Sequence, residues 1–170
     1  MKLIKRIILL LIIVIAIAGG VLAYKGHKIY KDVLEKTSVA DKVTQIKSQE
    51  NYTELKDLPD FYKNAVIAVE DRRFYKHGPI DPIAIARAVF VNIKSWELQE
   101  GGSTITQQLA KNIYFTQEKS ALRKVAEIYM AYEIERNCDK DTILELYLNT
   151  SYFGDGYYCV NDASEGYYGK

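Results

Sequence analysis

GGSTITQQLAKN, from Gly101 to Asn112, is the stretch that decides the expected fold, because it combines a helix start with side chains that a hydrophobic core does not need. The glycine pair breaks the preceding helical pattern, and Thr104 with Gln107 has the spacing of a capping box. A helix is therefore predicted to start at this break, with its first N–H groups directed toward a cleft. The hydroxyls, amides and lysine of the stretch indicate hydrogen bonds and positive charge for a sugar or phosphate.

An acidic pair follows an apolar run upstream of this stretch. Residues 65–69 are all apolar and lead into EDRRFYKHGPID, from Glu70 to Asp81. We expect the run to belong to a buried helix that delivers Glu70 to the point where the chain leaves the core. Removal of water from this carboxyl group would make it a better proton acceptor. The alternative is an exposed glutamate paired with Arg72 or Arg73.

Helical patterns run through the rest of the chain, and the sequence has neither an alternating strand pattern nor an internal repeat. Besides the helix after Gly102, we expect helices over residues 59–73, 81–92, 120–136 and 141–148. In the second of these, Asp81 is the expected N-cap and Pro82 the first helical residue. The predicted fold class is all-α, with one domain around one core.

The N-terminus has the composition of a membrane span. Residues 7–24 carry no charge, and at ~1.5 Å per residue a helix of this length nearly crosses a ~30 Å hydrocarbon core. The small residues Ala16 and Ala18, with one residue between them, also fit a signal-peptide cleavage site, but the apolar run continues past them. We therefore predict a cytoplasmic tail (1–6), a transmembrane signal anchor (7–24), a juxtamembrane stalk (25–58) and a folded domain (59–170).

Charge and cysteine content exclude several classes of function. The formal net charge is +1, and no basic patch interleaved with aromatic residues indicates a nucleic-acid partner. The two cysteines, Cys138 and Cys159, have neither a Cys-x-x-Cys spacing nor histidines beside them, which argues against a zinc site. Two free thiols are favoured over a disulfide, although an extracytoplasmic domain could form one.

Five segments resemble the peptidoglycan glycosyltransferase family, which includes the monofunctional enzymes and the transferase domain of class A penicillin-binding proteins. The segments are EDRRFYKHGPID (70–81), GGSTITQQLAKN (101–112), RKVAE (123–127), ILELYLN (143–149) and the tail 152–170. The resemblance implies a lysozyme-like all-α domain behind a single transmembrane helix. It also implies that the domain lies on the extracytoplasmic side of a bacterial cell membrane. Relatives usually continue beyond the last segment, so we expect either a shortened domain or a piece of a longer one.

The resemblance implies two catalytic glutamates. Glu70 matches the base of the family, and Glu127 matches the glutamate that positions the sugar-pyrophosphate of the donor, directly or through Mg²⁺ or Mn²⁺. No organic cofactor is expected, and the ligands of the metal are not evident. The residues alone leave an alternative for Glu127, because it lies on a helix that is apolar on two faces with Arg123 four residues before it, as in a structural ion pair.

The other predicted site residues would bind the substrate or shape the cleft. They are Asp71, Phe74, Ser103, Thr104, Gln107, Gln108, Lys111, Lys119 and Arg123. The alternative for the lysines is a solvated charged face. His77 is expected to order the turn 77–79 rather than to act as an acid or base, and segment 143–149 is expected to pack in the core.

By resemblance, the chain would be a glycosyltransferase that polymerises lipid II into β-1,4-linked glycan strands, with inversion and release of undecaprenyl pyrophosphate. The expected partners are lipid II, the growing strand, the membrane and separate transpeptidases, because no transpeptidase signature follows. One alternative is a lysozyme-like enzyme that cleaves glycan, although a neutral polymer gives no reason to gather lysine and arginine. The other is a truncated, non-catalytic protein that binds lipid II or the cell wall.

Overall fold

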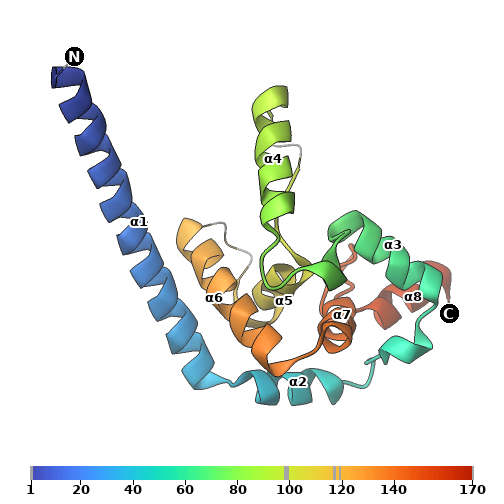
Figure 1. Ribbon diagram of the computed structural model, residues 1–170. Coiled ribbons are helices and arrows are strands. Elements are labelled where there is room, and N and C mark those ends of the chain that lie inside the picture. The colour runs from blue at the N-terminus through green and yellow to red at the C-terminus, as the bar shows by residue number, and fades with distance from the viewer. Residues whose placement is uncertain (1, 98–99, 117, 119, 170) are drawn as a thin grey trace.

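The computed structural model describes residues 2–97, 100–116, 118 and 120–169. These residues form helices joined by loops (Figure 1): α1 (Lys2–Lys36), α2 (Val39–Lys47), α3 (Asp60–Glu70), α4 (Pro82–Ser95), α5 (Ile105–Tyr114), α6 (Ala121–Asn137), α7 (Lys140–Leu148) and α8 (Val160–Tyr168), with 3-10 turns at Leu55–Asp57 and Phe74–Lys76. The described part of the chain contains no β-strand, and only Gly154 and Tyr157 form an isolated bridge. The all-α prediction is confirmed.

Helix α1 is a single helix that includes the predicted span and continues past it. It is the one described helix that is long and apolar enough to cross a membrane, with a mean hydropathy of 3.0 over its most apolar window. Its N-terminal half extends away from the other helices, and α4 projects to the same side (Figure 1). The structure thus fits a single transmembrane helix before the domain, as predicted.

The C-terminal half of α1 packs against α6. Gly26 is buried at this contact, where a Cβ atom would lie 2.5 Å from Val125 Cγ1. One turn farther on, the hydroxyl of Tyr30 donates a hydrogen bond of 3.1 Å to Glu133. The small glycine therefore lets the two helix backbones approach closely, and the tyrosine fixes their register.

The segment 25–58 does not stand apart from the domain as the predicted stalk would. Tyr30 belongs to the hydrophobic core, as do Val39 and Ile46 of α2. The segment is polar on average, but a few apolar residues on one side of each helix are enough to attach it to the domain. The other proposed boundaries within the chain stay a prediction.

The centre of the core lies where α5 contacts α6 and α7. Each of these helices contributes fully buried side chains: Leu109 from α5, Met130 and Ile134 from α6, and Ile143 and Leu144 from α7. The expectation that segment 143–149 packs in the core is therefore confirmed. Both predicted catalytic glutamates and segment 101–112 are positioned around this centre.

Helix α3 differs from the prediction of a buried helix. None of its residues is buried, and Val69 is 81% exposed. Its hydrophobic contacts with the core come from the partly buried side chains of Tyr62, Val66 and Ile67. Five consecutive apolar residues surround a helix, whereas only one side of α3 faces the core, so the run 65–69 cannot be buried as a whole.

The predicted helix starts agree with the structure. Asp81, Thr104 and Ser120 are N-caps whose side chains accept a hydrogen bond from the backbone of the first helical turn. The helix predicted over 59–73 ends at Glu70, and α2 and α8 lie outside the predicted helices. Cys138 and Cys159 are both free thiols, as favoured by the sequence.

We predict that Gly26→Ala destabilises the protein by about 1–3 kcal/mol, because the added methyl group forces α1 away from Val125. Thermal unfolding of the detergent-solubilised chain measures this change. Gly20→Ala is the matched control, because a Cβ atom at Gly20 meets no other atom within 4 Å and the same gain in helix propensity applies. Equal melting temperatures for the two variants would contradict close packing at Gly26.

Candidate active site

Helix α5 begins inside the protein, and its first N–H groups are paired by side chains. Thr104 accepts a hydrogen bond of 3.1 Å from the backbone N–H of Gln107, whose side chain accepts one of 3.2 Å from the N–H of Thr104. The predicted capping box is thus present. Only 1% of Thr104 and 2% of Gln107 is exposed, and Thr104 also donates to the carbonyl oxygen of Pro79. These two side chains hold the site together from within, and direct substrate contacts for them stay a prediction.

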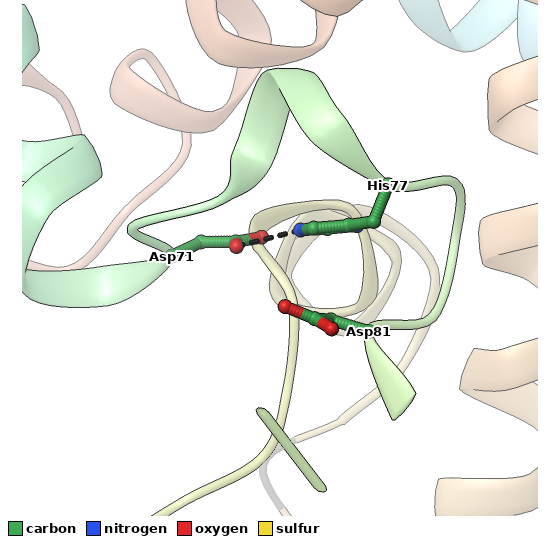
Figure 2. A group of neighbouring side chains, drawn as sticks. All are labelled: Asp71, His77 and Asp81. Atoms are coloured by element: carbon green, nitrogen blue, oxygen red, sulfur yellow. Dashed lines mark hydrogen bonds and ion pairs between the residues drawn. The ribbon is translucent and has the colours of Figure 1, made fainter. Parts of the chain in front are cut away.

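Asp71 completes the N-terminus of α5 from a distant part of the chain. Its Oδ2 atom accepts a hydrogen bond of 3.0 Å from the N–H of Ile105, and its Oδ1 atom lies 2.7 Å from Nε2 of His77. The other ring nitrogen of His77 lies 2.6 Å from the carbonyl oxygen of Gly78. His77 therefore orders the turn, in agreement with its predicted role. Figure 2 shows this dyad with Asp81 beside it.

Asp81 caps α4 and pairs with Arg73. Its carboxylate accepts a hydrogen bond of 2.9 Å from the N–H of Ile83, and Oδ2 lies 3.3 Å from Nε of Arg73. That arginine nitrogen has no well-aligned hydrogen bond, so the contact is an ion pair only. Burial opposes ionisation, but the N–H groups of Ala84 and Ile83 and the charge of Arg73 outweigh it and hold the pKa of Asp81 below its usual value.

Asp71, His77 and Asp81 are close enough together to be considered as metal ligands, since their ligand atoms lie within 4.8 Å of one another. The donor set does not fit a resident cation. Both oxygens of Asp71 face the N–H of Ile105 or the His77 ring, and the oxygens of Asp81 face a backbone N–H and a guanidinium. A divalent ion would have to displace these partners. The cation predicted with Glu127 stays a prediction.

Glu70 is the last residue of α3 and is exposed. The prediction that burial removes water from this carboxyl group is therefore wrong. The alternative ion pair with Arg73 is also wrong, because Arg73 contacts Asp81 instead. The side-chain amide of Gln108 donates a hydrogen bond of 3.0 Å to Oε2 of Glu70. Glu70 also lines a cavity of about 350 Å³ between α3 and the segment 147–153.

Glu127 is the opposite case, a carboxylate with 2% exposure inside the core. Arg123 donates a hydrogen bond of 2.6 Å to Oε1, so the predicted partner is confirmed. Lys124 donates a second one of 3.1 Å to Oε2 and a third of 2.7 Å to the hydroxyl of Ser103. Lys124 is not among the predicted site residues, although its spacing of three residues from Glu127 was the available signal.

Segment 103–108 connects the two glutamates. Ser103, at one end, reaches Glu127 through Lys124, and Gln108, at the other end, bonds directly to Glu70. Two separate sets of hydrogen bonds, one around each glutamate, are therefore joined by the backbone of this segment: Ser103 and Arg123 belong to the set around Glu127, and Gln108 belongs to the set around Glu70. An exposed carboxylate beside a cavity and a buried carboxylate held by two cations suit different steps of one reaction.

The remaining predicted residues are placed less directly. Phe74 is fully buried, with Nζ of Lys140 at 4.5 Å from the centre of its ring, so it shapes the core under the site. Lys111 is half-buried on α5, one turn beyond Gln108, and forms no ion pair with any described residue. Lys119 lies outside the described residues.

A larger cavity, of about 850 Å³, opens elsewhere, beside Asn112 and Asn149. Its lining contains carboxylates and amides but neither Glu70 nor Glu127. Size therefore does not identify the site, which is recognised by its pair of glutamates and the cations around one of them.

The family of the chain follows from comparison with known proteins. A family model described as Transglycosylase matches residues 36–170. The chain belongs to the transglycosylase family. This membership confirms the family predicted from the five segments.

The relatives are much longer proteins. Penicillin-binding protein 1A of Aquifex aeolicus is 48% identical over 119 residues, which cover 70% of this chain and 16% of the relative. Penicillin-binding protein 1A of Neisseria lactamica is 48% identical over 119 residues, which cover 70% of this chain and 15% of the relative. Penicillin-binding protein 1F of Bacillus subtilis is 48% identical over 116 residues, covering 68% and 16%. The chain therefore spans only about a sixth of the length of these relatives.

We predict that Asp81→Asn, which keeps a good helix cap but removes the charge facing Arg73, destabilises the protein by about 1–2 kcal/mol at pH 7. The pKa of Asp81 is lowered on folding, so its charge stabilises the folded state above the unfolded pKa of about 4. The difference from the wild type should shrink as the pH falls from that value and disappear below the lower pKa of the folded state. Denaturant unfolding at several pH values measures it.

Asp139→Asn is the matched control for this experiment, because Asp139 also caps a helix but is exposed to solvent. A smaller effect is expected there. Equal effects of the two substitutions at pH 7 would show that the buried ion pair with Arg73 contributes nothing beyond the cap.

Proposed function

We propose that this chain is a peptidoglycan glycosyltransferase that joins lipid II units into β-1,4-linked glycan strands with release of undecaprenyl pyrophosphate. The observation that carries the proposal is the arrangement of two unlike glutamates at opposite ends of segment 103–108. Glu70 is open to solvent beside a cavity, and Glu127 is buried between two cations. Membership of the transglycosylase family supports the reaction class.

Glu70 acts as the general base in this proposal. Its carboxylate takes the proton of the 4-hydroxyl of the acceptor N-acetylglucosamine, and the resulting oxygen attacks the anomeric carbon of the donor N-acetylmuramic acid. The bond from this carbon to the pyrophosphate breaks as the new glycosidic bond forms, so the configuration inverts. Glu70 is exposed here, and therefore the bound saccharide itself must exclude water from the carboxylate.

The buried end of the site stabilises the leaving group. Arg123 and Lys124 together carry two positive charges against the single negative charge of Glu127, which leaves a net positive charge at this end. Each cation has N–H groups beyond those bonded to Glu127 and Ser103, and these can reach phosphate oxygens. Lys111 adds a third cation from α5. A divalent cation is not needed for this account, and no step is routed through one.

The membrane context is part of the proposal. Helix α1 anchors the chain, the domain lies on the extracytoplasmic side, and the lipid tail of the substrate stays in the bilayer while its sugars enter the site. The cations around Glu127 disfavour a glycan-cleaving enzyme, because cleavage of a neutral polymer has no pyrophosphate leaving group to stabilise.

We predict that Glu70→Gln lowers the rate of lipid II polymerisation by a factor of about 10²–10⁴, because the amide cannot accept the acceptor proton. The assay uses the detergent-solubilised full chain and separates glycan products by length. Glu54→Gln is the control, since Glu54 is an exposed glutamate whose one ion pair among the described residues is with Lys56.

Polymer from the wild type and from Glu54→Gln, with little from Glu70→Gln, would support both the reaction and the base. Equal polymer from all three would refute the role of Glu70. Shortening of added glycan without polymerisation would indicate the cleaving enzyme, and binding of lipid II without any product would indicate a binding protein.

A further inference from the structure

Tyr147 contacts the site although its segment reads as core packing. It lies on α7 with 7% of its surface exposed, next to the fully buried Leu146 and Leu148. Its hydroxyl donates a hydrogen bond of 3.2 Å to Oε1 of Gln108. The amide nitrogen of the same Gln108 donates one of 3.0 Å to Oε2 of Glu70. Three helices, α7, α5 and α3, thus contribute one residue each to a continuous hydrogen-bonded line.

The direction of this line is fixed by chemistry. An ionised carboxylate accepts hydrogen bonds and donates none, so only the NH₂ group of Gln108 can face Glu70. The carbonyl oxygen of the amide then faces Tyr147, whose hydroxyl must donate. Burial and the charge of Glu70 raise the pKa of Tyr147 to about 12, which keeps that proton on the hydroxyl. Rotation of the amide by half a turn would place two acceptors against each other.

The line restrains a side chain that nothing else holds among the described residues. Glu70 is exposed at the end of α3, whereas Tyr147 is buried in the core. Gln108 is hydrogen-bonded to both side chains and therefore restrains the exposed Glu70 relative to the buried Tyr147. Oε2 of Glu70 is occupied by Gln108, and no described residue bonds to Oε1. The oxygen left for a substrate proton is therefore Oε1. Glu70, which carries this atom, lines the cavity of about 350 Å³.

We propose that Tyr147 and Gln108 are positioning residues that hold Oε2 of Glu70 and present Oε1 as the oxygen that receives the acceptor proton. This inference rests on the proposed glycosyltransferase function and assigns two residues beyond it. In the step, the O–H bond of the acceptor hydroxyl breaks and an O–H bond forms at Oε1. Gln108, predicted as a substrate ligand, acts instead through Glu70, because both ends of its amide are used within the protein.

The first test is Tyr147→Phe, which removes one oxygen atom and keeps the ring that packs in the core. Loss of the anchor leaves the amide of Gln108 free to turn, so the base is correctly oriented for a smaller fraction of the time. We expect kcat for lipid II polymerisation to fall about tenfold, with KM unchanged, because the substrate contacts themselves remain. Tyr114→Phe is the matched control: its hydroxyl also makes one hydrogen bond, to the carbonyl oxygen of Thr37, away from Glu70.

The second test is a double-mutant cycle with Gln108→Ala. If Tyr147 acts only through Gln108, the variant carrying both substitutions should have the same kcat as Gln108→Ala alone. Effects that multiply would show that Tyr147 acts by another route and would overturn the proposal. Melting temperatures of all variants separate this outcome from a loss of folding, and if Tyr147→Phe does not fold, an unchanged kcat for Gln108→Ala overturns the proposal by itself.

The outcomes also separate this inference from the proposed function. A wild-type chain that polymerises lipid II, together with a Tyr147→Phe variant whose kcat equals that of Tyr114→Phe, overturns the positioning role and leaves the transferase intact. A rise in KM at constant kcat overturns it as well, because it would make Gln108 a substrate ligand. A wild-type chain without polymerising activity refutes the proposed function, and the positioning role falls with it.

Discussion

The buried N-terminus of α5 is the constraint on which the site depends. A helix that starts in the interior must have its first N–H groups paired, because water cannot reach them. Thr104 and Gln107 pair two of these backbone groups, and Asp71 pairs the N–H of Ile105. Since Asp71 follows Glu70 directly, the same hydrogen bond places the exposed end of α3 beside α5, one turn from Gln108. The arrangement of the candidate site thus follows from the need to satisfy a helix end.

The sequence predicts the local part of this arrangement and misses the long-range part. The capping box could be predicted because Thr104 and Gln107 are three residues apart and their contact depends on the helix alone. The bond from Asp71 to Ile105 joins residues 34 positions apart, and no periodicity reports it. The pattern of segment 143–149 correctly indicates a buried Tyr147, yet it carries no information on the partner of the hydroxyl.

Two wrong predictions, one of too much burial and one of too little, show that the composition of a segment does not determine how it packs. The apolar run 65–69 predicts burial, but Val69 is 81% exposed, because apolar residues on every side of a helix exceed what one contact can cover. The polar segment 25–58 predicts a separate stalk, but Tyr30, Val39 and Ile46 attach it to the core. Average polarity describes a segment as a whole, whereas packing depends on the few side chains that share one face.

The unbroken length of α1 has a mechanical consequence. A helix of 35 residues is about 52 Å long, and the C-terminal half of α1 packs against α6, which carries Arg123 and Glu127. The height of these side chains above a bilayer is therefore set by the number of residues in one rigid helix, and not by a flexible linker. Removal of one residue between the apolar part and Gly26 would lower the domain by about 1.5 Å and turn it by about 100° about the helix axis. The lipid-linked substrate of the proposed function, whose own depth is fixed by its tail, would then meet a differently oriented opening.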